Sequence, residues 1–244
     1  MLSANYKEGD IMYSYHGYNS TLEKKEALNV YVAKVFGWMF LGLSLTALTA
    51  LYVASSEMVL NAVFSNRLLF YGLMIGEVLL VMYLSGWISK IRPSTAVFIF
   101  LLYSVLNGVN LSVIFLAFTA GSIAYAFFIT AITFGIMSVY GYATRNDLTR
   151  TGNLLFMGLV GFVILSVVNM FIASSSLEWI MSILGLFAFL GLTAYDTQGI
   201  KQLYYETGGY YDLHKKVSIL GALRLYLDLI NIFLILLRLF ARKK

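Results

Sequence analysis

The fold of this chain is decided by its last apolar stretch, residues 223–240, which read LRLYLDLINIFLILLRLF. This run is close to the roughly 20 mostly apolar residues that an α-helix needs to cross a bilayer. Asp228 is its single acidic residue. An ionisable side chain at membrane depth is costly and commonly marks an ion or proton pathway. The stretch therefore predicts a membrane-spanning helix with a functional position inside it.

Similar runs fill most of the chain. Seven can be drawn, at residues 35–54, 68–88, 96–118, 121–141, 153–173, 177–198 and 219–240. Of the 244 residues, 60% are hydrophobic and 12% are charged, whereas roughly a quarter are charged in soluble domains. The runs lack the alternating polar positions of a membrane β-barrel. We expect an all-α polytopic membrane protein, with a polar cytosolic segment over residues 1–30 and one seven-helix domain over residues 31–244.

Basic residues gather at the ends of the apolar runs. They precede the first run and follow the second, fourth and sixth: Lys24, Lys25, Lys34, Lys90, Arg92, Arg145, Arg150, Lys201, Lys215 and Lys216. Cytosolic loops carry such an excess, so we expect a cytosolic N-terminus. The net charge of +5 then suits anionic lipid headgroups, and we expect no nucleic acid partner. Arg238, Arg242, Lys243 and Lys244 conflict with this rule if the last helix crosses fully, which we nevertheless expect because the early helices usually dominate orientation.

Asp196 ends the sixth run and forms a potential partner for Asp228. At 1.5 Å per residue, its depth matches the roughly 14 Å expected for Asp228 only if the sixth helix continues past Gly199 to Glu206. We expect this continuation, with a stop at Gly208-Gly209. Two carboxylates at one depth would titrate as a unit, which predicts a proton-sensing gate. They would also offer oxygen ligands to calcium, although the six to eight oxygens of a full site are not evident.

Both aspartates have plainer interpretations. Arg224 lies one turn before Asp228 and Asn231 lies one turn after it, so all three share a helix face. Asp228 could therefore be a structural carboxylate that Arg224 satisfies. Asp196 could be a polar boundary at the membrane interface.

Polar residues inside the other apolar runs include Glu77, Asn107 and Asn110. Together with Asn231, they would line an ion path or form hydrogen bonds between helices, which is the more frequent use of amides in membranes. The sequence leaves both uses open.

Several short motifs occur in an order that resembles the Bax inhibitor (transmembrane Bax-inhibitor-motif) family. They are Asn107-Gly108, Leu111-Ser112, YGYATRNDL at residues 140–148, AYDTQ at residues 194–198 and GALRLYLDLIN at residues 221–231. The resemblance covers nearly the whole chain after the polar N-terminus. It implies a seven-helix fold with the last helix central and a pH-sensitive calcium leak.

In that family, the aspartates of the Tyr-Asp-Thr-Gln motif and of the last helix form a pH-sensing pair, which corresponds here to Asp196 and Asp228. Many relatives also have an arginine near the cytosolic end of the second helix that can latch onto the pair. This chain has Trp87 at that position, so either Lys90, Arg92 or Arg224 replaces the latch or no latch exists.

The function we expect is therefore a calcium leak channel or transporter in a bacterial plasma (inner) membrane. Its partners would be the lipid bilayer, protons and calcium as the transported ion, and we expect no tightly bound cofactor and no enzymatic activity. One alternative is a non-transporting adaptor that regulates other membrane proteins. A remote alternative is an intramembrane aspartyl protease, although the Gly-x-Gly-Asp motif of such enzymes is replaced by Leu225-Tyr226-Leu227-Asp228.

Overall fold

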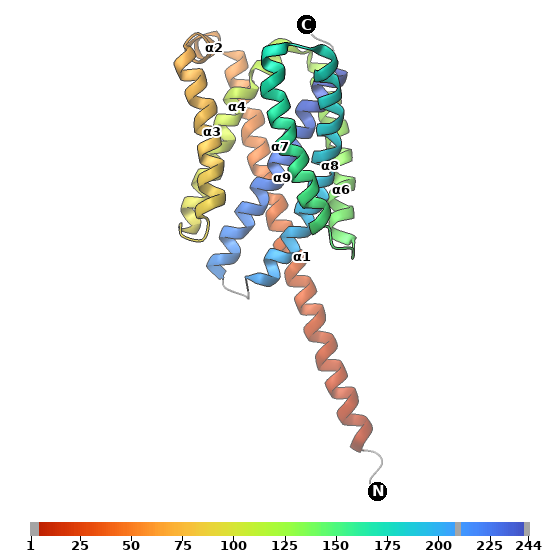
Figure 1. The fold of residues 1–244 in the computed structure, drawn as a ribbon. Coiled ribbons are helices and arrows are strands. Elements are labelled where there is room, and N and C mark those ends of the chain that lie inside the picture. Colours follow the sequence, from red (N-terminus) through yellow and green to blue (C-terminus); the bar gives the residue numbers. More distant parts are fainter. Residues whose placement is uncertain (1–4, 208–210, 242–244) are drawn as a thin grey trace.

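A computed structural model describes residues 5–207 and 211–241 of the chain. Within these ranges the chain forms nine α-helices (Figure 1). They are α1 (Asn5–Ser55), α2 (Glu57–Phe64), α3 (Arg67–Trp87), α4 (Pro93–Leu111), α5 (Val113–Ala117), α6 (Ala120–Ala143), α7 (Thr149–Ile172), α8 (Ser175–Glu206) and α9 (Tyr211–Phe240). In the part of the chain so described, seven helical spans are long and apolar enough to cross a membrane. The expected all-α architecture with seven spanning helices is confirmed.

Short polar caps start the helices and keep their connections tight. Asn66, Thr119 and Ser174 each accept a backbone N–H of the helix that follows, at α3, α6 and α8. Pro93 is the first residue of α4, where its missing N–H breaks no helical hydrogen bond. These short connections make successive helices antiparallel, as Figure 1 shows for α7 and α8.

Two helices differ from the runs drawn on the sequence. The third run is divided, because α4 ends at Leu111 and α5 resumes at Val113. The Ser112 hydroxyl between them donates to the carbonyl of Val109 at 2.7 Å. In addition, α1 continues without a break from Asn5 through its membrane span, Glu23–Ser55, and its first part projects beyond the bundle (Figure 1).

The last helix, α9, is the centre of the bundle. It packs against α1, α4, α6 and α8, and 78% of its apolar span is buried, compared with 0% for α7. Ile219, Leu225, Tyr226 and Ile232 on α9 are fully buried. A helix that is apolar on nearly all sides must be surrounded by others or by lipid, and here protein surrounds it. The central position expected for the last helix is confirmed.

Glycines allow the closest helix approaches. A Cβ added to Gly141 of α6 would lie 2.1 Å from the carbonyl oxygen of Ala194 in α8. One added to Gly152 of α7 would lie 2.4 Å from the Tyr195 ring. Small residues at such contacts let backbones meet directly. Both contacts fix the part of α8 that carries Asp196.

The basic residues gather at one end of the bundle. The turns at residues 88–92 and 144–148, the end of α8 and the start of α9 all lie there (Figure 1). At the opposite end, Arg238 of α9 forms an ion pair with Glu178 of α8 at 3.7 Å. The helix α9 thus runs the full length of the bundle, as expected for a full crossing. Arg242, Lys243 and Lys244 lie outside the described residues.

Candidate functional site

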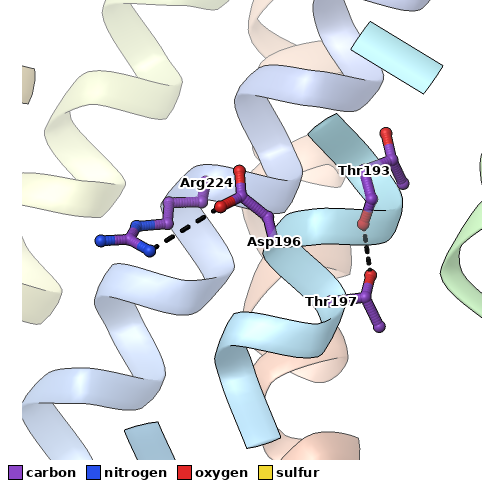
Figure 2. Close-up of polar contacts among 4 residues, drawn as sticks. All are labelled: Thr193, Asp196, Thr197 and Arg224. Atoms are coloured by element: carbon purple, nitrogen blue, oxygen red, sulfur yellow. Dashed lines mark hydrogen bonds and ion pairs between the residues drawn. The ribbon is translucent and has the colours of Figure 1, made fainter. Parts of the chain in front are cut away.

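Asp196 lies well inside α8, because this helix continues to Glu206 as expected. Gly208 and Gly209, the expected stop, lie outside the described residues. The hydroxyls of Thr193 and Thr197 donate to backbone carbonyls one turn earlier, at 2.8 and 2.7 Å, and so are satisfied within α8. Figure 2 shows these threonines on one side of α8, whereas Asp196 points toward α9.

Asp196 forms an ion pair with Arg224 of α9 (Figure 2). The distance from Nη1 of Arg224 to Oδ1 of Asp196 is 3.7 Å, which is longer than a hydrogen bond. The Asp196 side chain is 16% exposed, whereas that of Arg224 is 42% exposed. The guanidinium therefore reaches the carboxylate from a partly exposed position.

Asp228 is the most buried member of the site. The residue is 4% exposed, and its Oδ2 has no hydrogen-bond partner within the described residues. Its charge is influenced by the like charge of Asp196 and the opposite charge of Arg224. Burying a carboxylate without hydrogen bonds is unfavourable.

A cavity of about 590 Å³ opens beside these residues, between α7, α8 and α9. Its polar lining consists of Asn153, Asp196, Arg224, Asp228 and Asn231. The amide nitrogen of Asn231 donates to the Leu227 carbonyl at 2.8 Å. A water molecule takes up about 30 Å³ in the liquid, so the cavity is large enough for several waters or a hydrated ion.

The contribution of Asn153 was not predicted from the sequence. It is the fifth residue of α7, directly after Gly152, and the fifth apolar run drawn on the sequence begins with it. The nearby contact of Gly152 with Tyr195 brings this turn of α7 against α8. The sequence signal that could have indicated Asn153 is its place beside Gly152 at the start of an apolar run.

Glu77, Asn107 and Asn110 lie in a different part of the bundle. The side chain of Asn110 on α4 lies beside the Glu77 carboxyl of α3. The amide of Asn107 donates to the hydroxyl of Tyr103 at 3.1 Å. One oxygen of each of these three predicted residues is buried without a hydrogen-bond partner in the described chain.

This second cluster reaches α9 at Tyr226. The Glu77 carboxyl acts electrostatically on Tyr226, whose hydroxyl shares a 2.7 Å hydrogen bond with that of Thr46. Tyr226 precedes Asp228 by two residues, so the two side chains leave the helix in nearly opposite directions. The structure therefore separates the Glu77 cluster from the aspartates by the width of α9.

Arg224 is the cation that the structure brings to the aspartates. Lys90 and Arg92 are exposed in the turn between α3 and α4, outside the cavity lining, and neither forms an ion pair with a described residue. Trp87 stacks on Tyr83 with ring centroids 5.8 Å apart. Of the three predicted latch cations, Arg224 alone forms an ion pair with one of the two aspartates, Asp196, within the part of the chain the structure describes.

Few oxygen ligands converge at this site in the described chain. Among the described residues, no group of three or more His, Cys, Asp or Glu side chains could hold a metal ion. Asp196, Asp228 and Asn231 supply fewer oxygens than the six to eight that calcium usually takes. Water would have to complete the shell of any ion bound here.

Comparison with known proteins places the chain in a family. A family model described as "Inhibitor of apoptosis-promoting Bax1" matches residues 28–244. The chain belongs to the Bax inhibitor family. The resemblance inferred from the motifs is confirmed, and with seven apolar spanning helices this family member is an integral membrane protein.

Its relatives in this family include several bacterial proteins. The chain is 46% identical to the inner membrane protein YbhL of Escherichia coli (strain K12) over 228 residues, which cover 93% of this chain and 97% of YbhL. It is 44% identical to an uncharacterized protein of Borreliella burgdorferi over 226 residues, covering 92% and 97% of the two chains. It is 39% identical to the Rickettsia prowazekii protein RP147 over 221 residues, covering 90% and 92%.

Proposed function

We propose that this Bax inhibitor family member is a pH-sensitive leak pathway for calcium, gated by Asp196 and Asp228. The observation that carries the proposal is the buried Oδ2 of Asp228, which has no hydrogen-bond partner in the described chain and belongs to a residue lining a cavity large enough for water. Such carboxyls inside membranes commonly bind protons or transported cations.

Arg224 gives the gate two states. With Arg224 held at Asp196, a positive charge lies beside the cavity and repels a calcium ion. When the half-exposed guanidinium leaves, the two carboxylates and the Asn231 amide are available to a cation and its water shell. A cation shifts the equilibrium between the closed and open states only by the amount that it binds the open state more tightly. To open the gate, its binding must therefore outweigh the ion pair between Arg224 and Asp196.

Protons compete with calcium for the same oxygens. At acidic pH, protonation of the pair removes negative charge and weakens cation binding, whereas at higher pH the charged pair favours passage. Because the carboxyls interact, they lose their protons as a coupled pair. Asp196 forms an ion pair with Arg224. This pairing argues against Asp196 sharing a catalytic proton with Asp228, as the two aspartates of an aspartyl protease do.

The Glu77 cluster supplies polar groups for the other side of α9. Its three buried oxygens without partners in the described chain suit brief cation contacts. Because α9 separates this cluster from the aspartates, a continuous path requires α9 to move against α4. Such helix shifts are a common form of switching.

The proposed location is a bacterial plasma (inner) membrane with the N-terminus in the cytosol. Support comes from the name of YbhL as an inner membrane protein and from the basic residues gathered at one end of the bundle. Under the positive-inside rule that end faces the cytosol. The aspartates would then be approached from the cytosolic side.

Calcium uptake into liposomes that contain only the purified protein tests the proposal. Wild type should admit calcium faster than empty liposomes, and Asp228→Asn should change that rate. Glu57→Gln, which alters an exposed carboxylate on α2, should not. If wild type admits no more calcium than empty liposomes, the leak proposal fails and the adaptor alternative becomes the better account.

A further inference from the structure

A second pocket lies at the basic end of the bundle. Its volume is about 600 Å³, and it is formed by α1, the turn between α6 and α7, and the last part of α8. The residues that matter for its chemistry are Lys25, Tyr142, Arg145, Asp147, Gln198 and Lys201. None of them lines the aspartate cavity.

Gln198 fixes one wall of this pocket. The residue is 7% exposed, and its Oε1 accepts the backbone N–H of Leu148 at 2.9 Å. Its Nε2 donates to the carbonyl of Asn146 at 2.8 Å. Both bonds hold the turn that carries Arg145 against α8. A cationic side chain on a turn held in this way loses less entropy on binding a ligand.

Lys201 and Tyr142 form a second wall. The Lys201 ammonium donates to the carbonyl of Tyr142 and lies 5.4 Å from the centre of its ring. The Tyr142 hydroxyl in turn donates to the Asn29 side chain of α1. These contacts join α1, α6 and α8 around the pocket. An ammonium has three protons to donate, so Lys201 keeps donors for a ligand.

The charge of the pocket is positive and unbalanced. Lys25, Arg145 and Lys201 line it, and none of them forms an ion pair within the described residues. Its one carboxylate is Asp147. The hydroxyl and the backbone N–H of Thr149, which donate at 2.6 and 2.9 Å, hold the pKa of this exposed carboxyl below its ordinary value. Three cations therefore line the pocket beside one carboxylate, whose Oδ1 accepts both hydrogen bonds from Thr149.

We propose that this pocket binds a phosphate group. Cations on three separate elements around one concave space suit an anion with several acceptor oxygens, and an arginine can hold two of these oxygens at once. The ligand is either the headgroup of an acidic phospholipid or a soluble phosphate compound. This site is separate from the calcium pathway and does not depend on it.

Thermal unfolding of the purified full-length protein tests the proposal with two probes. The first is sodium phosphate in detergent, compared with sodium chloride at equal ionic strength. The second is nanodiscs of phosphatidylcholine with or without phosphatidylglycerol. The test variant is Lys25→Gln combined with Arg145→Gln. Its matched control is Lys34→Gln combined with Arg150→Gln, which removes two exposed cations near the same end but outside the pocket lining.

At least one probe should raise the melting temperature of wild type and of the control. The test variant should bind that probe about tenfold more weakly for each cation removed, which corresponds to loss of a charge-assisted contact. A response to sodium phosphate identifies a soluble ligand, and a response to phosphatidylglycerol alone identifies a lipid headgroup. The proposal is wrong if neither probe has an effect, or if the test and control variants lose the effect equally.

Discussion

Gly141 offers the sharpest test of how helix packing places the aspartate site. An alanine here would bring its Cβ to 2.1 Å from the Ala194 carbonyl oxygen and 2.8 Å from the Ala194 Cα. Ordinary contact begins near 3.4 Å, so α6 and α8 must separate by about 1 Å at this point. Overpacking of this kind costs about 1–3 kcal/mol. For a chain of this size, each 1 kcal/mol lowers the melting temperature by roughly 2–4 °C.

The assay is thermal unfolding of Gly141→Ala in detergent, beside Gly135→Ala as its matched control. Gly135 is on the same helix, but a Cβ added there meets nothing within 4 Å. Gly135→Ala should therefore be neutral or stabilise by up to about 1 kcal/mol, because alanine is the better helix former. The reasoning is refuted if both variants melt alike, or if Gly141→Ala is as stable as wild type.

Three further predictions follow from single contacts. Tyr226→Phe removes a buried 2.7 Å hydrogen bond to a threonine hydroxyl of α1 and should lower the free energy of unfolding by about 1 kcal/mol; an unchanged denaturation midpoint would contradict this. Arg224→Gln removes the cation beside the aspartates, so calcium flux should become half-maximal at a higher pH; an unshifted pH profile would mean that Arg224 has no part in gating. Gln198→Ala removes both hydrogen bonds that hold the turn between α6 and α7, so trypsin should cleave faster after Arg145, as measured by mass spectrometry. The control Gln202→Ala changes an exposed side chain and should not alter this rate. Equal cleavage rates in the two variants would show that Gln198 does not hold the turn.

The spanning helices were predictable because each apolar run is long enough to cross a bilayer. The continuation of the sixth helix to Glu206 was also predictable, since residues 201–206 favour a helix. The break at Ser112 was not, because the run is apolar on both sides and carries no proline. At the break, the Ser112 hydroxyl donates a hydrogen bond to the backbone carbonyl of Val109. This contact depends on local geometry, which the hydrophobicity of the sequence does not indicate.

Within the site, the residues of one helix face and the partner at matched depth, Asp196, were predictable, but the place of Glu77 was not. Helical spacing puts Arg224 and Asn231 on the face of Asp228, and all three line one cavity. Depth along a helix says nothing about which helices are neighbours. Glu77 could therefore not be separated from the aspartates by sequence alone. Its position follows from α3, which packs mainly on α4, away from α8.

The most direct test of the central claim is the pH profile of calcium flux in liposomes, for wild type beside Asp196→Asn and Asp228→Asn. The account predicts that wild-type flux rises with pH and that either substitution flattens this dependence. If both variants keep the wild-type profile, the aspartate pair is not the proton sensor.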